Sequence, residues 1–193
     1  MEQQLFNFLK DLISSDDNFI RSLKPFFLTK SFKTGELFLD KAEKANLFGI
    51  VENGMFKICY LKHDGSEAIK TFRNQGELIG SYSDFLKNQE SQVTVEAMKP
   101  SRVSYIPREC LNDFFNFSPN VEVIRRKIAE RLYCEKENRE YQFLCLNAYQ
   151  RLELFMKHFS PKIFALIDNQ ISKYLGVTPV YLSKLRKNYS FNE

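Results

Sequence analysis

Residues 168–188 read DNQISKYLGVTPVYLSKLRKN and contain two short helical segments separated by a turn. Gly176 ends the first segment, at a position where the backbone becomes left-handed and only glycine avoids strain. Thr178 is a helix-capping residue type, and Pro179 follows it at the first helical position, where its missing N–H costs nothing. Two short helices joined by a glycine-containing turn are typical of a helix-turn-helix, whose second helix enters the major groove of DNA.

The same arrangement is also a common packing unit in all-α proteins, and the distribution of charge favours the DNA-binding alternative. Residues 147–193 contain seven Lys or Arg against three Asp or Glu, so their net charge of +4 equals that of the whole protein. Residues 1–146 are neutral overall, with 21 basic and 21 acidic side chains. A basic end on a neutral body is typical of a protein that meets a polyanion through one domain.

Residues 26–107 have the composition of a small β-domain. They contain six of the seven glycines and alternate short β-rich segments with turns. Asn53-Gly54 is a strong hairpin signal, because both central residues of a type I′ turn need positive φ. Residues 56–61 alternate as in a sheet with one face in water. We therefore predict a compact β-barrel or sandwich, preceded by two short helices within residues 1–24.

Residues 121–146 have the pattern of one long helix, with Ser118 and Asn120 near its capping position. A helix of this length measures roughly 37 Å, which is more than one small domain needs. It is expected to connect two domains or to form a coiled-coil-like dimer seam. The alternative is a solvated amphipathic helix that packs on one side only. A further helix is predicted for residues 148–159.

Several classes of protein are disfavoured by the sequence. The N-terminus does not resemble a signal peptide and no apolar run approaches the roughly 20 residues that span a bilayer, so we expect a cytoplasmic protein without a membrane partner. The four cysteines and two histidines match no metal-ligand spacing, so no cofactor is expected, although a redox-sensing thiol at Cys134 or Cys145 stays open. We do not expect an enzyme, because there is no HExxH, no GxxxxGK[ST] and no nucleophile–base constellation.

The order of these parts resembles the Crp/Fnr family of bacterial transcription regulators. The resemblance rests on short segments: Gly35-Glu36, residues 50–58 (IVENGMFKI), 64–67 (DGSE), 76–80 (GELIG), 174–179 (YLGVTP) and 182–187 (LSKLRK). The last two are most similar to the branch of the family that is common in Bacteroidetes-like bacteria.

The resemblance implies an α+β fold made of three parts. Residues 1–118 would form an N-terminal double-stranded β-helix, which is jelly-roll-like and similar to a cyclic-nucleotide-binding domain, together with the N-terminal helices. Residues 119–146 would form a long dimerisation helix, and residues 147–193 an all-α helix-turn-helix domain. The implied function is transcription regulation by a homodimer that binds double-stranded DNA with its recognition helices about one turn (~34 Å) apart. RNA polymerase is a further expected partner.

The helical pattern of the C-terminal segment predicts which side chains face DNA. Leu182 and Leu185 lie on one face of the second helix, and polar side chains lie on the other. We expect Lys184 to contact a guanine edge, and the remaining cations to contact phosphates. The candidate DNA-binding residues are Thr178, Tyr181, Ser183, Lys184, Lys187 and Lys173. The candidate residues of the dimer helix are Ile124, Ile128 and Leu132.

The resemblance also implies an effector pocket in the β-domain, and here the sequence departs from relatives that bind cyclic nucleotides. Gly76-Glu77 matches the position of the glutamate that holds the ribose hydroxyl in those relatives. The Arg and Ser or Thr that meet their cyclic phosphate fall on Ser91-Gln92-Val93-Thr94, where no basic side chain is present. The candidate pocket residues are Gly76, Glu77, Ser91 and Gln92. We expect an unidentified small-molecule effector, weak binding of cyclic AMP, and a role in the turn for Glu77.

An alternative function follows from the start of the second helix. Pro179 and Val180 occupy its first positions, and neither side chain can make a bidentate contact with a base. The protein would then be an effector- or partner-sensing module whose degenerate helix-turn-helix no longer reads DNA specifically.

Overall fold

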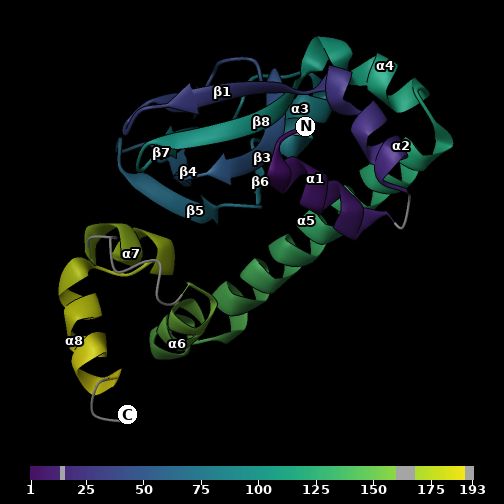
Figure 1. Cartoon of the computed structure of the whole chain (residues 1–193). Helices are drawn as coiled ribbons and strands as arrows, with labels where there is room; N and C mark the ends of the chain where they lie inside the picture. The colour runs from purple at the N-terminus through teal and green to yellow at the C-terminus, as the bar shows by residue number, and fades with distance from the viewer. Residues whose placement is uncertain (14–15, 160–167, 190–193) are drawn as a thin grey trace.

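The computed structural model describes residues 1–13, 16–159 and 168–189, with side chains as far as Lys187. A β-domain flanked by helices is followed by a long helix that leaves it, and the C-terminal helices then lie back against the β-domain (Figure 1). The order of the elements is the one predicted from the sequence.

Two four-stranded antiparallel sheets form the β-domain, with the strand orders β1-β8-β3-β6 and β2-β7-β4-β5. Their facing sides enclose an aromatic core, in which the ring of Phe32 lies 5.8 Å from that of Phe38 and 5.7 Å from that of Phe56. The strands are β1 (Leu28–Phe32), β2 (Leu37–Leu39), β3 (Leu47–Asn53), β4 (Met55–Leu61), β5 (Glu67–Asn74), β6 (Leu78–Ile79), β7 (Thr94–Ala97) and β8 (Ser101–Pro107).

Short helices cover the outer side of the first sheet, and a buried carboxylate attaches one of them. Glu52 on β3 accepts hydrogen bonds from the backbone N–H of Gln4 (2.8 Å) and Leu5 (3.0 Å) and from the Ser104 hydroxyl (2.7 Å). It therefore caps the N-terminus of the first helix from across the fold, because those N–H groups have no partner within the helix. The helices are α1 (Gln3–Leu12), α2 (Asp17–Ser22), α3 (Tyr82–Lys87) and α4 (Leu111–Asn116), with 3₁₀ turns η1 (Lys24–Phe26) and η2 (Arg108–Cys110).

The predicted long helix is confirmed as α5 (Pro119–Cys145), which has 27 residues. The Ser118 hydroxyl accepts a hydrogen bond from the N–H of Asn120 and caps its start. Val121 and Ile124 are buried against the β-domain, and most of the helix beyond them is exposed. Helices α6 (Ala148–Phe159), α7 (Asp168–Leu175) and α8 (Pro179–Tyr189) follow.

The outer face of the second sheet is buried, which the sequence did not predict. On β4 the first five residues are buried, so the expectation that one face of this strand lies in water is wrong. Apolar side chains of β4 and β5 form a second core with the C-terminal helices. Its buried members are Met55, Cys59, Ile69, Phe72, Leu152, Phe155, Phe159, Ile171, Tyr174, Leu175, Leu182 and Leu185.

Candidate nucleic-acid interface and effector region

Helices α7 and α8 form the helix-turn-helix, and the capping residues act as predicted. Gly176 has φ of +70°, in the left-handed region that ends the first helix. The Thr178 hydroxyl accepts a hydrogen bond from the N–H of Tyr181 at 3.2 Å, and helix α8 begins at Pro179. Arg186 on α8 is ion-paired with Asp168 on α7, which joins the two helices directly.

Helix α8 has one buried and one exposed face. Leu182 and Leu185 are buried in the second core, as predicted. The exposed face brings together five of the six candidate DNA-binding residues: Thr178, Tyr181, Ser183, Lys184 and Lys187. Because Lys184 and Lys187 form no ion pair among the described residues, their charges are available to an anionic partner.

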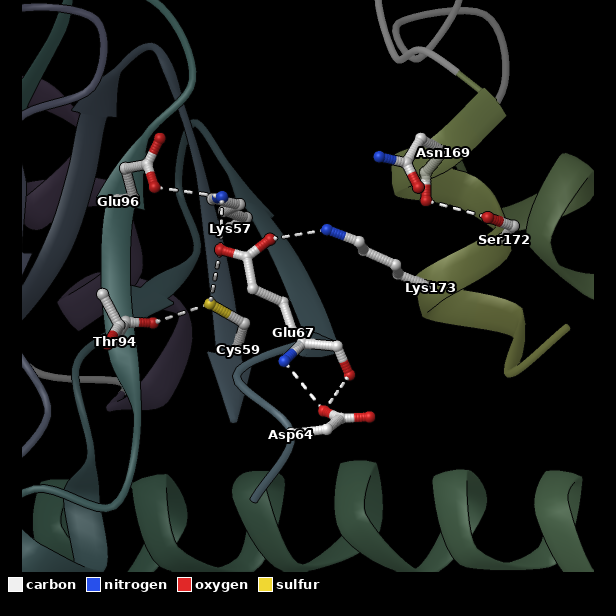
Figure 2. Close-up of polar contacts among 10 residues, drawn as sticks. Lys57, Cys59, Asp64, Glu67, Thr94, Glu96, Asn169, Ser172 and Lys173 are labelled. Carbon is white, nitrogen blue, oxygen red and sulfur yellow. Dashed lines mark hydrogen bonds and ion pairs between the residues drawn. The ribbon is translucent and has the colours of Figure 1, made fainter. Parts of the chain in front are cut away.

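The sixth candidate, Lys173 on α7, is engaged elsewhere in the structure. Its Nζ lies 3.0 Å from Glu67 on β5, and the other Glu67 oxygen lies 2.9 Å from Lys57 (Figure 2). Lys57 also lies 3.0 Å from Glu96. We call these four residues the Glu67 cluster. Lys173 is therefore paired with a carboxylate of the β-domain, unlike Lys184 and Lys187 on α8.

The hydrogen bonds within the Glu67 cluster favour the charged forms of Glu67 and Lys57. Burial raises the pKa of the Glu67 carboxyl, but the hydrogen bonds from Lys57 and Lys173 lower it, and the pKa ends below its ordinary value. Burial lowers the pKa of Lys57, but Glu67 and Glu96 raise it, and the pKa ends above its ordinary value. For Glu67 and Lys57, the charged partners therefore outweigh the loss of contact with water on burial.

Two of the four candidate pocket residues, Glu77 and Ser91, are hydrogen-bonded within their own turns. The Glu77 carboxylate accepts a hydrogen bond from the N–H of Asn74 at 2.7 Å and closes the turn around Gly76, which has φ of +82°. This is the turn role predicted for Glu77. The Ser91 hydroxyl is bonded to the backbone of Val93, which leaves it engaged in its own loop.

Asp84 on α3 contacts the loop at Gln92, a role that was not among the predictions from the sequence. Its carboxylate is buried and accepts hydrogen bonds from the Ser81 hydroxyl (2.6 Å), the Gln89 amide (2.7 Å) and the N–H of Gln92 (3.1 Å). Burial raises the pKa of Asp84, but these hydrogen bonds lower it, and the net direction is below the ordinary value. The donors of this loop therefore converge on an internal anion. A sequence signal was available, since an acidic residue stands among Ser and Gln donors in SYSDFLKNQ.

An apolar cavity of about 50 Å³ lies between the first sheet and helices α1, α3, α4 and α5. Its walls include Phe8, Ile50, Phe85, Phe114 and Ile124. None of the four candidate pocket residues lines it.

The dimer-helix prediction needs a correction at Ile124. This side chain is 1% exposed and packs in the core of its own chain, so it is unavailable to a second chain and the prediction is wrong for it. Ile128 and Leu132 are half-buried against the same core. The exposed apolar side chains of α5 are Tyr133, Tyr141, Phe143 and Leu144.

The described parts of the chain hold no group of three or more His, Cys, Asp or Glu side chains that is placed to bind a metal ion. Cys134 and Cys145 are exposed on α5, whereas Cys59 is buried. Burial and the neighbouring Glu67 carboxylate raise the pKa of the Cys59 thiol to about 11. Within the described ranges, no helix has the length and apolar character needed to cross a membrane.

Comparison with known protein families identifies the same β-domain. Residues 29–116 match the cyclic nucleotide-binding domain. No curated protein sequence matches the chain.

Solved structures extend the likeness to the C-terminal helices. FixK2 from Bradyrhizobium japonicum is similar with a TM-score of 0.76 and 17% identity, over 86% of this chain and 85% of that one. A transcriptional regulator of the Crp/Fnr family from Eubacterium rectale is similar with a TM-score of 0.74 and 14% identity, over 98% and 89% of the two chains. The c-di-GMP-responsive global regulator CLP from Xanthomonas campestris is similar with a TM-score of 0.71 and 14% identity, over 92% and 93%. The predicted fold class, with a cyclic-nucleotide-binding-like β-domain, a long helix and a C-terminal helical domain in the Crp/Fnr architecture, is confirmed.

Proposed function

We propose that the protein is a transcription regulator that binds double-stranded DNA as a homodimer and is not an enzyme. The observation that carries the proposal is the exposed face of α8, where Tyr181, Lys184 and Lys187 stand over a buried helix-turn-helix core. The entire net charge of the protein lies in residues 147–193, so this end is the one that attracts a polyanion. The Crp/Fnr architecture supports the proposal, and RNA polymerase is the further partner proposed for such a regulator.

The exposed face of α8 combines side chains suited to different parts of DNA. Lys184 is proposed to contact the O6 and N7 acceptors of a guanine, and Lys187 to contact a phosphate. Tyr181 and Ser183 can reach a sugar or a base edge. Thr178 already caps α8 through its hydroxyl, so we propose that it positions the helix and contacts phosphate only secondarily.

We propose that two chains pair along α5 through the face opposite to Ile124. At 100° per residue, Tyr133 and Leu144 lie within about 20° of each other on the helix, and Ile124 and Ile128 lie on the other side. Tyr133 is 60% exposed and Leu144 76% exposed, which are unusual values for large apolar side chains. Burying them against a second copy would remove this exposed apolar surface from water.

We propose that the effector is a small molecule other than cyclic AMP. The donors of the loop between α3 and β7 already hold the Asp84 carboxylate. A cyclic phosphate placed there would meet a second negative charge, and no Arg or Lys stands at Ser91 or Gln92 to offset it. Calorimetry with cyclic AMP is expected to show no binding in the micromolar range. A micromolar dissociation constant would overturn this part of the proposal.

DNA binding is tested with a gel shift on the DNA upstream of the protein's own gene, at two salt concentrations. We expect a shifted complex whose affinity falls steeply with salt, because phosphate contacts release counterions. Lys184→Ala is expected to relax sequence preference, whereas Lys187→Ala lowers affinity for every sequence by a similar factor. Equal effects of the two substitutions would remove the roles assigned to them.

A second candidate function is favoured by one observation at the start of α8. Val180 is 70% exposed, so a side chain without hydrogen-bonding groups stands where the helix would first meet a base. The protein would then sense an effector or a partner without reading DNA. Absence of any shifted complex at low salt would favour this second function over the first.

A further inference from the structure

The outer face of the second sheet is covered by the C-terminal helices through an apolar contact. Phe72 on β5 is 1% exposed, and its ring lies 5.6 Å from Tyr174, 6.0 Å from Phe159 and 6.4 Å from Phe155. These partners belong to α6 and α7, so they leave Phe72 if the C-terminal helices move away. The β-domain and the helix-turn-helix therefore share one core in the docked arrangement.

The Glu67 cluster lies at the edge of this contact and joins the two parts electrostatically. Lys57, Glu67 and Glu96 all belong to the sheet, and Lys173 is the one member from the helix-turn-helix. The four charges cancel when the helices are docked. Figure 2 shows these contacts in the docked arrangement. When the helices leave, Lys57 keeps its two carboxylates, but the ammonium of Lys173 loses its carboxylate and is free for another anion.

The anion that Lys173 would meet on DNA is a phosphate. Glu67 presents a carboxylate oxygen 3.0 Å from the Lys173 Nζ, which is ordinary geometry for a charge-assisted hydrogen bond. In the docked arrangement the Lys173 Nζ is directed at β5, against which α7 packs, so a DNA phosphate has to displace Glu67 to bind this ammonium. The two contacts then compete for the same group.

We propose that Glu67 acts as an internal competitor of a DNA phosphate for Lys173, so that docking of the C-terminal helices on the β-domain opposes DNA binding. The proposal rests on the proposed DNA-binding function and adds its regulation. By linkage, DNA that prefers the undocked form must also shift the protein towards that form. An effector that loosens the sheet from α7 would increase DNA affinity by the same coupling.

Cys59 provides a readout of docking that does not depend on DNA. Its thiol is 1% exposed in the second core, 3.7 Å from a Glu67 oxygen, and undocking would expose it. Alkylation of the full-length protein is followed by mass spectrometry of the peptide that contains Cys59, which separates it from the exposed Cys134 and Cys145.

Two substitutions release the same ion pair but act oppositely on DNA. Glu67→Gln is expected to speed Cys59 labelling several-fold. It is also expected to tighten DNA binding about two- to fivefold, because the competing ion pair is partly exposed and its loss changes the free energy only modestly. Lys173→Ala is expected to speed labelling as well but to weaken DNA binding, because the phosphate contact is lost with the competitor. Lys173→Ala leaves the Glu67 carboxylate beside the thiol, so faster labelling in this variant reports exposure and not a change in the thiol's acidity.

Glu96→Gln is the matched control. It removes a carboxylate that contacts Lys57 on the same face of the sheet but does not contact Lys173. The rate of Cys59 labelling and the DNA affinity should therefore change much less than in Glu67→Gln. Saturating wild-type protein with DNA should speed Cys59 labelling. The proposal fails if labelling is unchanged by DNA, or if Glu67→Gln behaves like Glu96→Gln. If neither the wild type nor Glu67→Gln binds any DNA at low salt, the proposed function fails, and the competition with phosphate fails with it.

Discussion

Asp84→Asn tests whether the loop that follows β6 depends on an internal anion. The carboxylate accepts four hydrogen bonds of 2.6 to 3.4 Å, from Ser81, Ser83, Gln89 and the N–H of Gln92. Asparagine has nearly the same shape but keeps only one acceptor oxygen, and its NH₂ group faces a donor. Losing one of these bonds and the charge assistance in the others should cost about 3 kcal/mol, given about 1.5–3 kcal/mol for a hydrogen bond to a charged group. For a protein of this size, that corresponds to a fall of about 6–12 °C in melting temperature.

The assay is thermal and urea unfolding followed by circular dichroism at neutral pH. Because the hydrogen bonds hold the pKa of Asp84 below its ordinary value, its contribution is present above the unfolded pKa and is lost as pH falls through the folded pKa. The difference between wild type and Asp84→Asn should therefore shrink in strong acid, below about pH 4. Asp113→Asn, at an exposed position of α4, is the control and should leave stability unchanged. An Asp84→Asn protein as stable as the wild type at pH 7 would refute the reasoning.

Three further substitutions test other parts of the structure. Glu52→Gln should destabilise the protein by about 2–3 kcal/mol and speed hydrogen exchange in α1, because the charged cap of that helix is lost. Gly176→Ala should lower the free energy of unfolding by about 1–3 kcal/mol in urea, since a Cβ there would lie 2.9 Å from the Phe143 ring at a positive φ. Leu144→Glu should convert a dimer into a folded monomer in size-exclusion chromatography with light scattering, because it places a charge in the proposed seam.

Matched controls separate the causes in these three tests. Glu36→Gln removes an exposed carboxylate with one local backbone bond and should cost far less than Glu52→Gln. Gly65→Ala has a similar positive φ but open space around the added Cβ, so it measures backbone strain without a clash. Leu154→Glu adds the same charge at an exposed position of α6 and should leave the oligomeric state unchanged. If a control variant changes stability or oligomeric state as much as its test variant does, the explanation given for that test is contradicted.

The elements predicted correctly from the sequence depend on neighbours along the chain. Gly176, Thr178 and Pro179 act within one turn of their own positions, and so their roles could be read from residue type and spacing. The predicted start of the long helix lies two residues from the observed one, because its cap and its composition are local as well. The turn role of Glu77 is of the same kind, with its partner only three residues away.

Local sequence does not predict which face of α5 packs against the β-domain of the same chain. Its apolar side chains lie on more than one side of the helix, so the sequence pattern predicts a partner chain for the stripe that includes Ile124. Only the packing of the β-domain shows that Ile124 is buried and that Tyr133 and Leu144 point away.

The sequence alone determined the order of the parts, the helix-turn-helix with its caps, and the placement of all the net charge at one end. Those properties follow from local conformational preference and from composition, which need no knowledge of distant contacts. Tertiary structure decided that Glu52 caps a helix 47 residues away and that Lys173 is paired with Glu67, 106 residues away. Such pairs form because folding brings charged groups that lose water to the few partners that can replace it, and the spacing of residues in the sequence does not indicate which partner that is.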